Sequence, residues 1–220
     1  PEFGRNTLEV LRQPIEEHEV HIARVAATVR LPAAFHLVAA ANPCPCGYAG
    51  SERRACTCPP GAIERYRARM SGPLLDRIDL QVRVGSVSFD EVRGDADGES
   101  SQAIRARVLE ARDRQERRLA PWKKRTNAEM PPEAQRTTCR VSADAEKALQ
   151  RLFEKRGGMS ARGLDRIVRV ARTIADLDGE NTISVGAIWE AAMYRVLDTD
   201  PSVDPRRFLP VRKGAPGSNP

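Results

Sequence analysis

Residues 35–47 read FHLVAAANPCPCG and join an apolar run to the first half of a cysteine cluster. The run at 35–41 is short, continuous and bounded by Pro32 and Pro43, a pattern typical of a buried strand in a parallel sheet. Asn42 follows at the carboxyl end of this predicted strand, the edge at which open α/β sheets bind ligands. Its amide therefore either orients a water or a phosphate, or only begins the turn before Pro43.

Four cysteines follow with the spacing C-x-C-x9-C-x-C: Cys44, Cys46, Cys56 and Cys58. Two close pairs joined by a loop suit a closed tetrahedral site of four thiolates, the arrangement of structural zinc. Two disulfides or four free thiols are the alternatives. Disulfides are disfavoured because no signal peptide is visible and a cytoplasmic chain, which we expect here, keeps its thiols reduced. The prediction is one structural Zn²⁺ held by these four residues, with Cys139 a small buried residue elsewhere.

Residues 74–84 read LLDRIDLQVRV and place Arg77 between Asp76 and Asp79. The alternation of apolar and polar residues over 80–84 predicts another strand, so that Arg77 lies at a helix-to-strand junction. A structural ion pair with a neighbouring carboxylate is one interpretation. The other is an arginine that one subunit offers to the γ-phosphate bound by its neighbour.

The first 70 residues also predict two short helices and a hairpin. Apolar residues recur at helical spacing over 6–15, and weak alternation over 20–31 indicates a β-hairpin. Residues 63–70 predict a second helix, which ends at the break formed by Ser71, Gly72 and Pro73.

From residue 100 onward the apolar period is that of helices. Helices are predicted from Ser100 or Ser101 to about Leu119, over 143–155 after Ser142, from Ser160 up to Gly179, and after Ser184, each beginning at a serine that can cap it. Residues 120–132 predict a charged linker, and the proline-rich residues 200–220 predict a disordered tail.

The composition is that of a largely helical intracellular protein. The chain has 220 residues, a net charge of +6 and no apolar stretch near the roughly 20 residues of a membrane helix, so membrane insertion is not expected. Residues 112–125 contain seven basic residues against two acidic ones. Such a run is either a solvated helix face or a surface that contacts phosphates.

Four stretches together resemble one family: PEFGRNTLEVLRQPIE at 1–16, VHIARVAATVRLPAAFHLVAAANPCPCG at 20–47, SGPLLDRIDL at 71–80 and MSARGLDRIVRVARTIADL at 159–177. They are similar to the magnesium-chelatase-like AAA+ ATPases, and the CPCG cluster is specific to the branch of bacterial competence proteins called ComM or YifB. The resemblance covers roughly residues 1 to 200.

The resemblance implies an α/β part followed by an all-α part. Residues 1–98 would be the C-terminal portion of an AAA+ αβα core with parallel strands and a four-cysteine loop at 42–60. Residues 99–199 would be the helical lid. Asn42 would be sensor 1, Arg77 the arginine finger acting in trans, and Arg162 the sensor 2 residue that contacts ATP.

The same resemblance implies that the hairpin at 20–29 lines the pore of a ring, with Arg24 near its tip contacting the DNA backbone. The expected whole protein is an ATP- and Mg²⁺-dependent homo-oligomeric ring, a hexamer, that acts on DNA as a branch-migration helicase. Two alternatives stay open: a chelatase-type ATPase that drives metal insertion into a tetrapyrrole, and a zinc-bearing nucleic-acid-binding module.

The sequence departs from the family pattern at its start. No G-x-x-x-x-G-K-[ST] motif occurs in it, so no loop here can cradle the ATP phosphates. In the family, the acidic pair that holds Mg²⁺ precedes a PEF motif like the one at 1–3, and Glu2 lies after that pair. We therefore expect a C-terminal fragment of a longer ATPase, which alone neither binds ATP tightly nor hydrolyses it.

Overall fold

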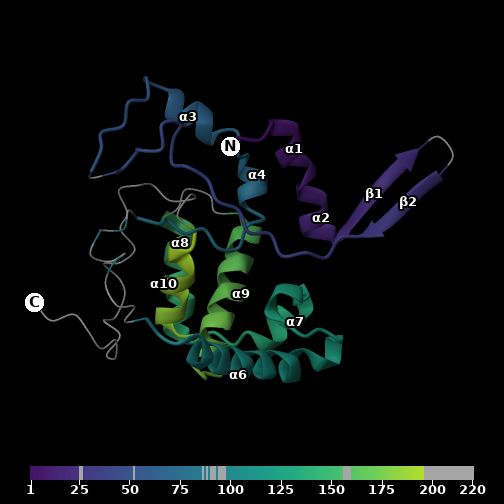
Figure 1. The fold of residues 1–220 in the computed structure, drawn as a ribbon. Helices are drawn as coiled ribbons and strands as arrows, with labels where there is room; N and C mark the ends of the chain where they lie inside the picture. The colour runs from purple at the N-terminus through teal and green to yellow at the C-terminus, as the bar shows by residue number, and fades with distance from the viewer. Residues whose placement is uncertain are drawn as a thin grey trace, which may run out of the picture. The chain divides into compact units, whose positions relative to one another are not determined.

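Two compact units make up the chain, which Figure 1 shows as a computed structural model. The described residues are 1–24, 27–51, 53–85, 87, 89, 93, 98–155 and 160–195. The N-terminal unit comprises Pro1–Ile78 with Val84–Val92, and the helical unit comprises Asp79–Arg83 with Arg93–Pro220. The tail predicted at 200–220 lies outside the described residues.

The helix predicted at 6–15 is two short helices, α1 (Arg5–Val10) and α2 (Arg12–Glu17). Pro14 explains the interruption, because proline has no N–H to donate to the carbonyl group of Val10 four residues earlier. Proline is tolerated in the first turn of the helix that follows, where N–H groups lack intrahelical partners in any case. His18 then ends α2 with φ of 58°, and the chain turns into a hairpin.

The predicted hairpin is confirmed and consists of β1 (Glu19–Arg24) and β2 (Ala27–Pro32). The two strands are antiparallel, with Glu19 opposite Pro32 at the base and Arg24 opposite Ala27 near the tip. Figure 1 shows the hairpin extending away from α2. Every described residue of the two strands is exposed except Val20, which is half-buried, so the hairpin is not held by a core.

The expected parallel sheet is not present in the described residues, whose one sheet is the β1–β2 pair. Residues 33–42 form neither helix nor strand. Val38, which was predicted to be buried in a strand, is 82% exposed. Within the part of the chain that the structure describes, parallel pairing is limited to two isolated bridges in the helical unit, Gln81 with Arg195 and Val141 with Ile183. The prediction fails because a parallel strand needs hydrogen-bonded neighbours and helices over both faces, and the described residues supply neither.

The break predicted at 71–73 is instead the start of a helix. Ser71 caps α4 (Gly72–Leu75), its hydroxyl group accepting the N–H of Leu74 at 3.3 Å, and Pro73 lies in the first turn. The preceding helix, α3 (Ala62–Arg67), carries Tyr66, whose hydroxyl group donates to Glu2 at 2.9 Å. This bond ties the first residues of the chain to α3.

Helices account for most of the helical unit. They are α6 (Ser101–Leu119), α7 (Pro132–Thr138), α8 (Ala143–Lys155), α9 (Ala161–Leu177) and α10 (Val185–Met193). All four predicted serine caps are confirmed: the hydroxyl groups of Ser100, Ser142, Ser160 and Ser184 each accept an N–H from three residues on, at 3.1–3.3 Å.

The linker predicted at 120–132 contains two 3-10 turns, η1 (Ala120–Trp122) and η2 (Asn127–Glu129), and α7 begins at its end. A capping box between Thr126 and Glu129 holds η2. Pro121 and Pro132 lie in the first turns of η1 and α7, where proline fits, and Pro131 is the residue before the first turn of α7.

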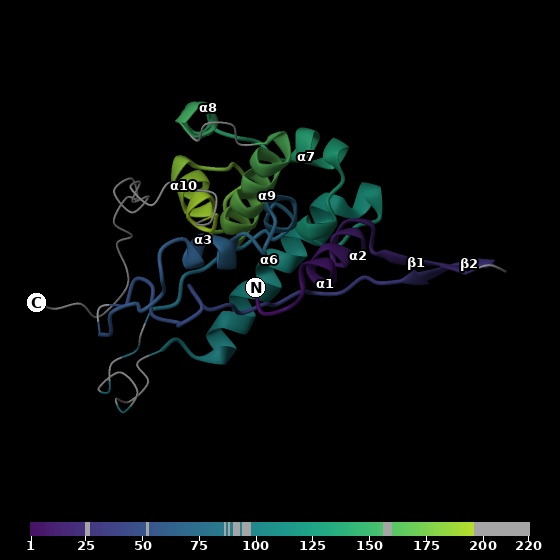
Figure 2. The ribbon, with the colours of Figure 1, turned by 90° about the horizontal axis from the view of Figure 1, so that it is seen from above.

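The core of the helical unit is aliphatic and centres on α9, which contacts α6 and α10 (Figure 2). Ile167, Ile188 and Leu119 are fully buried. On α6, Ala111 and Gln115 are buried, whereas Ile104 and Val108 are 42% and 41% exposed. No helix of the described residues is both long enough and apolar enough to cross a membrane.

Candidate metal centre and arginine sites

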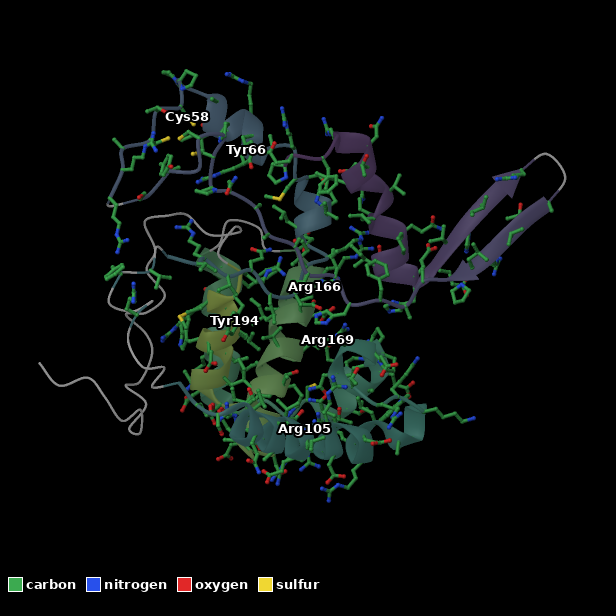
Figure 3. The ribbon with its side chains drawn as sticks, in the orientation of Figure 1. Cys58, Tyr66, Arg105, Arg166, Arg169 and Tyr194 are labelled. Atoms are coloured by element: carbon green, nitrogen blue, oxygen red, sulfur yellow. The ribbon has the colours of Figure 1, made fainter. Side chains whose placement is uncertain are left out.

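The four cysteines of the C-x-C-x9-C-x-C motif form one cluster before α3, where Figure 3 shows Cys58 among yellow sulfur atoms. Their four Sγ atoms all lie within 4.8 Å of one another. The Sγ atoms of Cys44 and Cys46 are 3.4 Å apart, and that of Cys56 lies 3.7 Å from Cys44 and 3.5 Å from Cys46. Cys44 is fully buried, whereas Cys56 is exposed.

A tight turn after Cys44 brings the first pair together. The carbonyl group of Cys44 accepts the N–H of Gly47 at 3.0 Å, and its Sγ accepts the N–H of Ala49 at 3.3 Å. Gly47 has φ of +83°, a left-handed conformation that glycine adopts without strain. The sequence Cys-Pro-Cys-Gly therefore positions two sulfur atoms on one side of the turn.

The surroundings of the cluster shift the pKa values of its thiols in opposite directions. Backbone hydrogen bonds from Tyr48 and Thr57 favour the thiolate and lower the pKa of Cys46 to about 5. Cys58 receives a backbone hydrogen bond from Cys46, but burial and the neighbouring thiols outweigh it and raise its pKa to about 12. A divalent cation would remove this conflict, because it stabilises four neighbouring thiolates at once.

The donor set fits a tetrahedral zinc ion. With Zn–S bonds of about 2.3 Å, the sulfur atoms of a tetrahedron lie about 3.8 Å apart, close to the separations seen here. All five cysteines of the chain are free, so the alternative of two disulfides does not describe this structure. Cys139 is buried away from the cluster, as expected, with its Sγ 3.6 Å from the sulfur atom of Met130.

Arg77 makes an ion pair, but with a different partner from those predicted. Its Nε donates to Glu16 of α2 at 2.9 Å, its Nη2 pairs with the same carboxylate, and its Nη1 donates to the carbonyl oxygen of Pro73 at 2.7 Å. Only 11% of the side chain is exposed. The neighbouring Asp79 pairs instead with Arg166 of α9. Glu16 could not be identified as the partner from the sequence, because 61 residues separate it from Arg77.

The other three predicted site residues are exposed. Asn42 lies in the irregular segment before Cys44, and Arg24 lies near the tip of the hairpin. Arg162 lies in the first turn of α9, one turn before Arg166. Asn42, Arg24 and Arg77 belong to the N-terminal unit and Arg162 to the helical unit.

A buried polar cluster in the helical unit was missed by sequence reasoning. Asp176 of α9 receives two hydrogen bonds from Arg118 of α6, at 2.7 and 2.5 Å, and one from Asn127 of η2 at 2.9 Å. Arg172, one turn earlier on α9, lies 3.1 Å from the same carboxylate. Burial lowers the pKa of Arg172 below its ordinary value, although Asp176 opposes this. The spacing of Arg172 and Asp176 on one apolar helix face is the one sequence signal that could have suggested the cluster.

Two family models match the chain. Residues 1–92 match "Magnesium chelatase, subunit ChlI", and residues 98–195 match "Magnesium chelatase, subunit ChlI C-terminal".

Curated relatives cover nearly the same part of the chain. The competence protein ComM of Haemophilus influenzae is 40% identical over 203 residues, and the uncharacterized protein YifB of Escherichia coli is 38% identical over 204, each match covering 90% of this chain. An uncharacterized protein of Mycobacterium tuberculosis is 39% identical over 194 residues, or 88% of this chain. The chain spans 38% of the length of each of these relatives. The chain therefore belongs to the magnesium-chelatase-like family that includes ComM and YifB.

Proposed function

We propose that the whole protein is an ATP-driven AAA+ motor that assembles as a ring, a hexamer, and acts on DNA as a branch-migration helicase. In this proposal the chain supplies the C-terminal part of the AAA+ core at 1–98 and the helical lid at 99–199. ATP and Mg²⁺ would bind mainly through residues outside this sequence, since the phosphate-cradling motif is absent from it.

The hairpin is the observation that best supports action on DNA. It carries Arg24 near the tip and Arg30 nearer the base, and within the described residues neither guanidinium group has a hydrogen bond or an ion pair. The twelve strand residues bury almost no surface, so the hairpin contributes little to the stability of the fold. The guanidinium groups of Arg24 and Arg30 are therefore available to a polyanion outside the chain.

The three residues of the proposed ATP site would have distinct roles. Asn42 would orient the attacking water, Arg77 would be offered to the ATP of the next subunit, and Arg162 would contact the ATP of its own subunit. Glu16 and Pro73 hold the guanidinium group of Arg77 itself, so the ion pair with Glu16 would have to open before Arg77 could reach the ATP of the next subunit. We propose that the four cysteines hold a structural Zn²⁺ that stabilises the loop after Asn42.

The test is ATP turnover by the full-length protein with and without branched DNA. We expect Arg24→Ala to weaken the apparent affinity for DNA on the order of tenfold, the usual effect of losing one charged hydrogen bond. Arg136→Ala is the matched control, since it removes the same charge from an exposed position on α7, outside the hairpin. Equal stimulation in both variants and the wild type would show that the hairpin tip does not contact DNA.

The family models favour one alternative, a chelatase-type ATPase that drives metal insertion into a tetrapyrrole. Its signature is ATP turnover stimulated by a porphyrin and a partner subunit and unaffected by DNA. The cysteine cluster does not supply the metal chemistry for it, because thiolates are soft ligands and Mg²⁺ prefers hard oxygen ligands.

A further inference from the structure

The positive charge of the chain is concentrated on α6 and the turn that follows it. Residues 101–125 contain nine basic and three acidic residues, a surplus of six that equals the net charge of +6 of all 220 residues. The remaining residues together therefore carry no net charge. Figure 3 marks Arg105 near the start of this basic segment, on α6.

Only part of this charge is neutralised within the chain. Arg107 pairs with Glu99, Arg118 with Asp176 and Arg125 with Glu116. Five cations of the segment have no hydrogen bond or ion pair among the described residues: Arg105, Arg112, Arg114, Lys123 and Lys124. Charges left unpaired over 25 residues indicate a polyanionic partner rather than a folding role.

A cavity beside α6 gathers three of the guanidinium groups. It has a volume of about 510 Å³ and is lined by Arg114, Arg117, Arg118, Asp176 and Asn181. It therefore lies between α6 and the turn after α9, inside the helical unit. The guanidinium group of Arg114 passes close to Gly179 of this turn, where an added Cβ would lie 3.4 Å from its Nη2.

The lining of the cavity is net positive. Its one carboxylate, Asp176, is already held by Arg118, Arg172 and Asn127 and adds no free negative charge. Arg117 pairs with Asp113, but both side chains are mostly exposed, and such pairs contribute little and exchange readily. Asp178 and Glu180, which flank the turn, do not line the cavity.

We propose that this pocket binds a phosphodiester group of a nucleic-acid backbone, with Arg114 and Arg117 as its two contacting residues and the amide of Asn181 as a further donor. Guanidinium groups match phosphate oxygens with paired N–H donors. The 19-residue α6 spans about 28 Å, so its unpaired cations extend over the length of several successive phosphates. This extent favours a nucleic acid over a single small anion.

The test is duplex binding by the chain, measured by the fluorescence anisotropy of a labelled 30-base-pair DNA across a series of KCl concentrations. The variant is Arg114→Gln with Arg117→Gln. The matched control is Arg136→Gln with Arg151→Gln, which removes the same charge from exposed positions on α7 and α8 that do not line the pocket. Circular dichroism melting of all proteins checks that they fold alike.

We expect the pocket variant to bind the duplex about tenfold or more weakly, with a salt slope reduced by about 2, since each phosphate contact contributes about 0.9. The control should lose less than about threefold. Equal losses in variant and control would mean that only overall charge matters, and the proposal would be wrong. It would be equally wrong if the variant lost affinity for inorganic pyrophosphate, or for an acidic peptide such as polyglutamate, while its duplex binding stayed normal.

The assay contains no ATP, so the inference does not depend on the proposed motor activity. A failure here would leave the hairpin and the ATP-site proposals unchanged.

Discussion

Cys44 is the residue on which the cysteine cluster depends most. It alone among the four thiols is fully buried, and it lies within 3.7 Å of the sulfur atoms of both Cys46 and Cys56. Its Sγ also accepts a backbone hydrogen bond from Ala49, which fixes its position within the turn. A change at this position alters the geometry of the entire donor set.

Replacing Cys44 with serine should abolish zinc binding, because a serine hydroxyl group stays protonated and is a poor zinc ligand. We expect one zinc ion per chain in the wild type and none in the variant, measured by elemental analysis after dialysis. Cys139→Ala is the control and should retain one zinc ion, since Cys139 is buried outside the cluster. A wild type that is folded without metal would contradict the proposed centre.

The short turn η2 depends on its capping box. The carboxylate of Glu129 accepts the N–H groups of Arg125 and Thr126 at 3.3 and 3.2 Å and the hydroxyl of Thr126 at 3.1 Å. Partial burial opposes ionisation, but these hydrogen bonds hold the pKa of Glu129 below its ordinary value. A carboxyl group with a lowered pKa stabilises the fold above its ordinary pKa, and this contribution is lost as the pH falls through the folded-state pKa.

Glu129→Gln should therefore lower the free energy of unfolding by about 1 kcal/mol at pH 7, because the amide oxygen of glutamine accepts the same N–H groups without the negative charge that strengthens these hydrogen bonds. The difference between wild type and variant should be smaller at pH 3 than at pH 7, because the contribution of the carboxylate is lost as the pH falls through its folded-state pKa. Urea denaturation at both pH values measures this. Glu110→Gln, at an exposed site on α6, serves as the control and should have no effect at either pH. A loss that is the same at pH 3 and pH 7 would contradict the role of the carboxylate charge.

Across the whole molecule, each unit is joined by contacts between residues far apart in the sequence. In the N-terminal unit, Glu16 holds Arg77 and Glu2 holds Tyr66. In the helical unit, Asp79 pairs with Arg166, and the N–H of Gln81 donates to the carbonyl oxygen of Tyr194 at 2.6 Å, so that residues 79–83 are fixed to α9 and α10.

The Asp176 cluster joins α6, η2 and α9, and its loss should destabilise the helical unit as a whole. Asp176→Asn leaves the buried Arg172 and the mostly buried Arg118 without a counter-charge, so we expect a loss on the order of 3 kcal/mol in the free energy of unfolding. Asp113→Asn removes the same charge from an exposed pair with Arg117 and should cost less than about 1 kcal/mol. Urea denaturation compares them, and similar losses in the two variants would refute the cluster's role.

The amino-acid sequence by itself determined four helices of the helical unit (α6, α8, α9 and α10), the hairpin and the cysteine motif, but it did not indicate α7. These features depend on local physics: serine hydroxyl groups cap helices at Ser100, Ser142, Ser160 and Ser184, alternation marks the hairpin, and Cys-Pro-Cys-Gly turns within four residues. Some of its errors were local too, since Pro14 divides a predicted helix and Pro73 lies in the first turn of a helix where a break was predicted.

Only the tertiary structure decided how the charges are paired and which apolar residues are covered. Arg77 pairs with Glu16 of α2, Asp79 pairs with Arg166 of α9, and Asp176 is the buried centre of a cluster. Val38, within a run that the sequence marks as buried, is exposed because no strand pairs with it among the described residues. The physical reason is the same in each case: burial and ion pairing are set by partners tens of residues away, and nothing in the local sequence specifies them.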